Sequence, residues 1–114
     1  MSYFEVDLSD QPIPTTDSNG DTYWRLPNGK IHREDGPAIE YANGSKFWYQ
    51  NGKRHRLDGP AEEYADGTKF WYQNGKLHRL DGPAREYSDG TKSWWINGRC
   101  LPEEEFNQRV NVLL

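Results

Sequence analysis

A short sequence repeat, with a period of about 23 residues, constrains this chain more than any other feature. The heptapeptide His-Arg-x-Asp-Gly-Pro-Ala begins at His32, His55 and His78, so consecutive copies are evenly spaced. The surrounding unit recurs about three and a half times, with a degenerate first copy near Tyr23 and a truncated last copy from Lys92. A fixed period of this kind is typical of repeat architectures, in which one supersecondary unit stacks on the next.

Within each unit the pattern is that of a β-hairpin. An aromatic run is followed by Asn-Gly, and a second short run ending in Tyr is followed by Asn-Gly or Asp-Gly. These dipeptides favour tight turns, because Gly reaches positive φ at little cost and Asn or Asp tolerates it. In the second copy we expect strands at 46–50 and 60–64, joined by the loop 51–59 and followed by a tight turn at 66–67. A third strand at 53–57 is an open alternative.

The sequence therefore predicts a mainly β fold: an elongated antiparallel meander of repeated β-hairpins with a short C-terminal capping helix. Residues 1–114 are expected to form one domain, since the chain is long enough for one modest core. Residues 1–20 form an N-terminal segment whose alternating stretch at 3–8 could pair as an edge strand. The repeats occupy residues 21–100, and the helix is expected within residues 101–114.

The C-terminal helix is predicted from its first turn and from one apolar stripe. Pro102 suits the first helical turn, and the acids at 103–105 are favourable at a helix N-terminus. The stripe follows at spacings of four, three and one residues and consists of Phe106, Val110, Leu113 and Leu114.

Composition limits the classes of function. The net charge of -4 gives no overall attraction to nucleic acid or to an anionic membrane, so nucleic acid is an unlikely partner. The single cysteine, Cys100, cannot form an internal disulfide or a cysteine metal cluster. The first residues contain no apolar signal segment, and no apolar run is long enough to span a bilayer. We therefore expect a soluble, cytoplasmic protein without membrane insertion.

The string Trp-Tyr-Gln-Asn-Gly-Lys-Arg-His at 48–55, nearly repeated one period later at 71–78, resembles the MORN repeat, in which an aromatic residue precedes Asn-Gly-Lys and a His. The likeness covers roughly residues 21–98. A typical MORN unit has Gly after the His, whereas Arg33, Arg56 and Arg79 stand there, and the Asp-Gly-Pro-Ala continuation also differs. This looks like a variant class, of the kind common in bacterial and phage proteins. The resemblance implies a hairpin-repeat sheet used for protein association, in some members for lipid contact, and without catalytic activity.

The aromatic residues are the first candidates for a partner-binding surface. Neighbouring residues in a strand point to opposite faces, so one face can be core while the other exposes rings. The exposed rings are either Trp48 with Trp71 and Trp94, or Phe47 and Tyr49 with their counterparts. Large exposed apolar patches mark interfaces, although cross-strand packing explains at least one face. The candidate contacts are Trp48, Trp71, Trp94, Trp95, Tyr49 and Tyr72.

The repeated His-Arg pairs are the second candidate site. Stacked units would place them in a row, where cations beside rings could hold a small anionic, nucleotide-like ligand. The residues of this row are His32, Arg33, His55, Arg56, His78 and Arg79. Each copy also carries its own acid, Asp35, Asp58 or Asp81, so a local ion pair that organises the loop accounts for the same pattern.

No pattern in the sequence indicates an enzyme, a cofactor or a metal site. The acids repeat uniformly, no Gly-rich phosphate loop is present, and histidines a full period apart are too distant to share an ion. We therefore expect a non-catalytic protein-binding module that acts through its aromatic sheet, with inhibition of a cellular or host-defence protein and homodimerisation as options. The alternatives are a sponge for a small anionic ligand and a structural assembly module. Four residues break the repeat and could confer specificity: Arg25, Ile39, Arg85 and Trp95.

Overall fold

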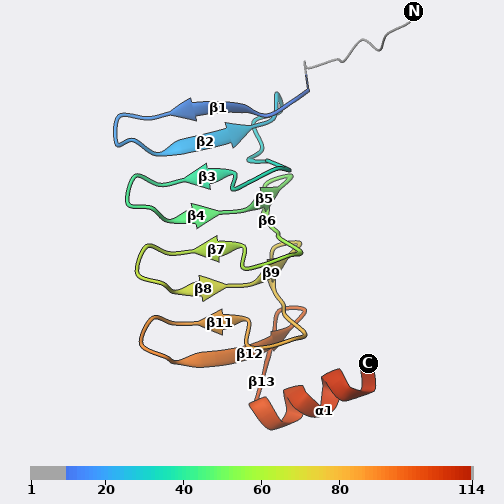
Figure 1. Cartoon of the computed structure of the whole chain (residues 1–114). Coiled ribbons are helices and arrows are strands. Elements are labelled where there is room, and N and C mark those ends of the chain that lie inside the picture. Colours follow the sequence, from blue (N-terminus) through green and yellow to red (C-terminus); the bar gives the residue numbers. More distant parts are fainter. Residues whose placement is uncertain (1–9, 114) are drawn as a thin grey trace, which may run out of the picture.

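The structure, a computed structural model, describes residues 10–113. It is mainly β and antiparallel, as predicted, and one short helix closes its C-terminal end (Figure 1). Nine strands form the main sheet, in the spatial order β1 (Ile13–Thr16), β2 (Thr22–Arg25), β3 (Ile39–Glu40), β4 (Lys46–Phe47), β7 (Glu62–Glu63), β8 (Lys69–Phe70), β11 (Arg85–Glu86), β12 (Lys92–Ile96) and β13 (Arg99–Leu101).

Each central unit adds a small ribbon beside this sheet. The ribbons pair β5 (Tyr49–Gln50) with β6 (Lys53–Arg54), and β9 (Tyr72–Gln73) with β10 (Lys76–Leu77). Their turns are Asn-Gly, and φ is positive at both residues of each turn, as a two-residue type I′ turn requires. The third strand that the sequence left open therefore exists, but it is two residues long and pairs within its own hairpin.

The aromatic run does not form the single strand that was expected at 46–50. The chain leaves the main sheet at Trp48, whose N–H donates to the Ala61 carbonyl at 2.7 Å and whose carbonyl accepts from the His55 N–H at 3.0 Å. One residue thus completes the main sheet and starts the ribbon. The strand expected at 60–64 is likewise shortened to Glu62–Glu63.

Successive units are also joined at both ends of their strands. At the ribbon end, the Gly52 N–H donates to the Ile31 carbonyl at 2.8 Å, and the next two units repeat this bond. At the turn end, the Ala65 N–H donates to Ser45 Oγ at 3.0 Å. These bonds matter because strands of two residues form few ladder bonds of their own.

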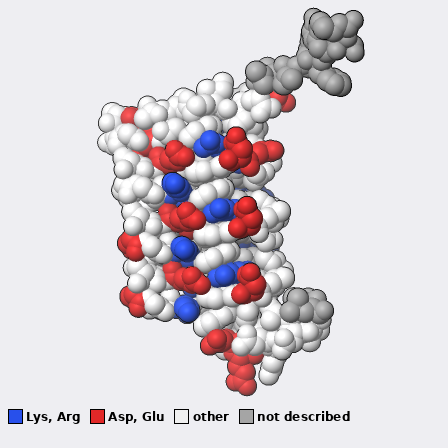
Figure 2. Space-filling model, in the orientation of Figure 1, with Lys and Arg blue, Asp and Glu red and all other residues white. Residues whose placement is uncertain are grey.

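The register assigns side chains to two faces, since residues paired across strands lie on the same side of a sheet. The charged face carries Glu40, Lys46, Glu63, Lys69, Glu86 and Lys92. The opposite face, called the ring face below, carries Tyr23, Ile39, Phe47, Glu62, Phe70, Arg85 and Ser93. Figure 2 shows a surface on which basic and acidic side chains alternate from row to row.

The core is small and lies where the ribbons meet the sheet. Ala61 and Ala84 have no exposed surface, so the ribbon backbone can approach closely, and Tyr72 and Leu77 fill the space from the ribbon side. Four large rings pack around this centre: Trp48, Phe70, Trp71 and Trp95.

The two ends of the sheet are closed differently. In β2, the backbone groups of Trp24 bond on the side away from β1. Its partner in β1, Pro14, therefore directs its own backbone groups outward, and a proline offers no N–H at this edge. At the other end, α1 (Glu103–Leu113) packs on β12 and buries Phe106 to 2% exposure. The predicted edge strand at 3–8 lies outside the described residues. Within residues 10–113, no helix is long and apolar enough to cross a bilayer.

The I′ turns give a first prediction. Asn74 has φ of 52°, which a β-branched residue adopts only with strain, so Asn74→Val should destabilise the protein by about 1–2 kcal/mol. Gln73→Val, one residue earlier in β9, is the control and should change stability by less than about 0.5 kcal/mol. Urea unfolding measures both, and equal effects would contradict the turn assignment.

Candidate functional site

Each arginine of the His-Arg pairs clamps its own loop onto a tryptophan. The Arg56 guanidinium lies 3.8 Å from the centre of the Trp48 ring. Its Nε donates to Asp58 Oδ1 at 3.1 Å, and its Nη1 donates to the Pro60 carbonyl at 3.0 Å and to Glu63 Oε1 at 3.2 Å. Arg33 over Trp24 and Arg79 over Trp71 repeat this stacking. One planar cation therefore fixes the loop, the ring and the following strand together.

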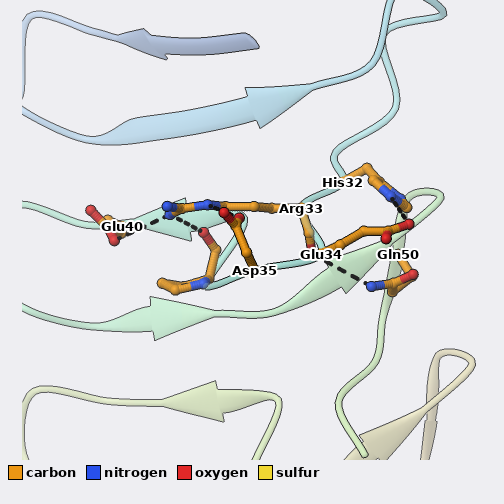
Figure 3. Close-up of polar contacts among 7 residues, drawn as sticks. His32, Arg33, Glu34, Asp35, Glu40 and Gln50 are labelled. Carbon is orange, nitrogen blue, oxygen red and sulfur yellow. Dashed lines mark hydrogen bonds and ion pairs between the residues drawn. The ribbon is translucent and has the colours of Figure 1, made fainter. Parts of the chain in front are cut away.

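The Asp-Gly-Pro sequence fits this clamp residue by residue. The aspartate accepts from Nε, and the proline carbonyl accepts from Nη1. The glycine leaves room, because a Cβ at Gly59 would lie 2.9 Å from Arg56 Cζ, and one at Gly82 would lie 2.8 Å from Arg79 Cζ. The glutamate of the next strand completes the set, which Figure 3 shows for Arg33, Asp35 and Glu40.

The histidines join one unit to the next. His32 Nδ1 accepts from the Asn51 N–H at 2.9 Å, and His55 and His78 accept at 3.0 Å from Asn74 and Asn97. An Nδ1 that accepts carries no proton, so the neutral ring has its proton on Nε2. In His32 this Nε2 donates to Glu34 Oε1 at 3.3 Å (Figure 3). The histidines thus hold the I′ turns of the following units.

Grooves run between successive loops, beside the clamped rings. The first, of about 570 Å³, lies between the loops of Arg33 and Arg56 over Trp48, and the second, of about 550 Å³, repeats it over Trp71. Both arginines of a groove already bond carboxylates. The aspartates are 86–88% exposed and line the same grooves. An added anion would therefore compete with carboxylates already in place, which disfavours the predicted anionic ligand.

The ring face carries a continuous ladder of six aromatic rings. Neighbouring rings meet edge to face, with centroids 5.1–6.4 Å apart. All six remain partly accessible, and Tyr87 is the most open at 37% exposure. In order along the sheet, the members of this ring ladder are Tyr23, Tyr41, Phe47, Tyr64, Phe70 and Tyr87. Phe47 and its counterpart Phe70 belong to one of the two sets of exposed rings that the sequence predicted. The four tyrosines of the ladder were not among the predicted contacts.

The six rings predicted to contact a partner are all buried or partly buried. Trp48 and Trp71 are each stacked under a guanidinium, and Tyr72 is buried at 6% exposure. Trp95 packs on the core and donates its Nε1–H to Ser93 Oγ at 2.8 Å. The remaining two, Trp94 and Tyr49, are half-buried in β12 and β5. Trp48, Trp71, Tyr72 and Trp95 therefore have structural roles, and partner contact through any of the six rings stays a prediction.

A buried polar cluster breaks the repeat beneath the ladder. Glu62 is 2% exposed, accepts from the Tyr64 hydroxyl at 2.9 Å and lies 3.4 Å from Arg54 Nη1. Arg54 also donates to the Tyr72 hydroxyl at 3.1 Å and stacks on that ring at 4.2 Å. Burial, followed by the hydrogen bond to Glu62, raises the pKa of Tyr64 above its ordinary value. The cluster ties a ribbon to the main sheet.

Sequence reasoning missed this cluster, although a signal was present. The position after the repeated Ala reads Ile39, Glu62 and Arg85 in successive units, so charge appears there only in the later copies. Arg85, which the sequence did single out, lies 5.0 Å from the Phe70 and Trp95 ring centres, and its Nε has no hydrogen-bond partner within the described residues. Among residues 10–113, no group of three or more His, Cys, Asp or Glu side chains is placed to hold a metal ion.

The histidine bond predicts a pH dependence of stability. Burial lowers the pKa of His78 below its ordinary value of 6.5, so the unfolded chain binds the proton at a higher pH than the folded chain does. The contribution of His78 is therefore complete above about pH 6.5 and is lost as the pH falls through the folded pKa. His78→Leu should cost about 1 kcal/mol at pH 8, and its difference from the natural protein should shrink as the pH falls below about 6.5. Urea unfolding across this range tests it, and a constant difference would contradict the lowered pKa of His78.

The arginine clamp predicts an unequal effect of two conservative changes. Lysine cannot stack its charge as a plane or bond in the same directions, so Arg79→Lys should destabilise the protein by about 1–2 kcal/mol. Arg99→Lys is the matched control, because Arg99 is exposed and has no ion pair within residues 10–113. Urea unfolding and the near-UV circular dichroism of the folded protein, to which the tryptophans contribute, provide the readouts. Equal losses of stability in both variants would show that the stacked arrangement of Arg79 does not stabilise the fold.

Comparison with known proteins finds no match at any of three levels. No family model, no curated protein and no solved structure matches the chain. The likeness to the MORN repeat accordingly rests on the motif and the period of this sequence, and it stays a prediction. The geometry of the ring ladder and of the loop grooves is the basis for the functional proposal.

Proposed function

We propose that this chain is a non-catalytic, cytoplasmic protein-binding module that docks on its partner with the ring ladder. One observation carries the proposal: six partly accessible rings form an unbroken strip along one face of the sheet. The ribbon of β9 and β10 packs on the core through Tyr72 and Leu77, and the strip of rings stays accessible within the described part of the chain. Extended aromatic surface on a water-exposed face is typical of interfaces.

The ladder suits binding because it is already ordered. Each inner ring is held edge to face by two neighbours, so little side-chain entropy remains to be lost on docking. Tyrosine adds hydroxyl groups that can exchange hydrogen bonds with a partner while the ring contributes apolar area. The fitting partner is a protein with a flat, mainly apolar strip that carries some hydrogen-bonding groups.

The resemblance to the MORN repeat supports protein association over catalysis, since that family is expected to act through its sheet. Inhibition of a cellular or host-defence protein is one use of such a surface and forms part of the proposal. The small anionic ligand is the second candidate. Paired guanidinium and indole groups in the loop grooves favour it, whereas the carboxylates in the same grooves oppose it.

The test compares capture of a partner by two double variants. Tyr41→Lys with Tyr87→Lys places two charges on the ring ladder, and Leu57→Lys with Leu80→Lys places two charges on the exposed loops. Tagged proteins are incubated with cell extract, and bound proteins are identified and quantified by mass spectrometry. We expect the ladder variant to capture at least tenfold less of the partner protein than the natural chain does, because buried charge opposes docking. The loop variant should capture as much as the natural chain.

Circular dichroism confirms that both double variants fold. Retention of the partner by a folded ladder variant would overturn the proposal. A partner lost only by the loop variant would move the interface to the grooves. Native mass spectrometry of the gently purified protein covers the alternative, since a retained mass of a few hundred daltons would favour the small ligand.

A further inference from the structure

A second apolar surface lies at the C-terminal end of the molecule. A groove of about 780 Å³ is lined by residues of the β12–β13 hairpin and of α1. Figure 1 shows these elements together at the C-terminal end. Ile96, Leu101 and Val112 provide the apolar lining of the groove, and Val112 is 86% exposed. This groove is separate from the ring ladder, whose members lie on β2 to β11 and on the adjoining turns.

The charged residues that line the groove are two arginines and one acid, Glu105, in a chain that is acidic as a whole. The arginines are Arg99 and Arg109, whereas the whole chain has a net charge of -4. Arg109 pairs with Glu105 at 3.2 Å within the helix, and Arg99 has no ion pair inside residues 10–113. The chemistry that fits is an apolar segment that also carries carboxylates.

The sequence itself contains such a segment. Residues 3–8 read Tyr-Phe-Glu-Val-Asp-Leu. In an extended conformation, Phe4, Val6 and Leu8 share one side, and Glu5 and Asp7 share the other. The apolar side is complementary to the groove lining, and the acids are opposite in charge to Arg99, which has no ion pair inside residues 10–113. We propose that residues 3–8 of a second copy of this chain occupy the groove.

A second copy is required because the segment cannot reach the groove of its own chain. β1 and β13 are the two terminal strands of the nine-stranded sheet, so eight steps of about 4.8 Å separate them by about 38 Å. Val6 precedes Ile13 of β1 by seven residues, which extend over at most about 25 Å. The centre of the segment therefore falls short of its own groove.

The resulting contact is head to tail. The segment lies at one end of the sequence and the groove at the other end of the sheet, so the two surfaces of the contact differ. Each copy would have one groove and one segment, and association would continue into rings or open chains. The edge at β1 resists direct strand addition, because Pro14 offers no outward N–H.

The test is sedimentation velocity of the full chain over a range of concentrations. The natural protein should show a rising average mass, whereas Val6→Asp and Arg99→Glu should each weaken association at least tenfold. Lys53→Glu is the matched control, because Lys53 occupies the position of Arg99 two units earlier and lies outside the groove. Adding Glu5→Arg to the Arg99→Glu protein should restore association through the reversed charge pair.

The outcomes separate this inference from the ring-ladder proposal. A natural protein that stays monomeric at every concentration overturns the inference, as does unchanged association in a folded Val6→Asp variant. Residue 6 lies outside the described residues. Loss of association in the Val6→Asp variant, together with an unchanged unfolding curve, therefore supports the contact. The ladder variant should still associate head to tail, and Val6→Asp should still capture the partner protein.

Discussion

Stacking of an arginine on a tryptophan is the interaction on which the rest of this structure depends. Strands of two residues cannot hold a sheet through their ladder bonds alone, so the loops between them must be fixed by other means. Arg56 does this by joining Trp48, Asp58, the Pro60 carbonyl and Glu63. The histidine before it then bonds the turn of the next unit, and stacking of the units follows from these two neighbouring residues.

The same constraint explains why the most conspicuous residues of the repeat are poor candidates for a ligand site. A guanidinium that already has a ring below it and two carboxylates beside it has little left to offer an anion. Binding would have to break bonds that hold the loop, and the protein would lose stability as a result. Surface that the repeat does not need for its own cohesion is therefore better suited to a partner, and the outer edge of the ring ladder is such a surface.

The period and the turn dipeptides predict the meander and the hairpins, because these depend on local geometry that recurs. The capping helix is predicted separately, from its first turn and its apolar stripe. Neither the period nor the turn dipeptides predict that the chain leaves the sheet at Trp48, since a run of three aromatic residues satisfies the pattern of one strand equally well. The pairing of each arginine with its aspartate could be anticipated from their close spacing in the sequence. The histidine bond could not, because its donor lies 19 residues away and is set by how the units stack.

The positions that break the repeat show where this fold tolerates difference. Ile39, Glu62 and Arg85 occupy one position on the ring face, yet they change from apolar to acidic to basic along the sheet. The middle unit compensates for its buried acid with Arg54 and Tyr64, and the next unit covers its arginine with Phe70 and Trp95. Since the clamps and histidine bonds are the same on either side of them, these residues vary the charge beneath the ring ladder without altering the stacking. A uniform scaffold can in this way present a surface that differs from one end to the other.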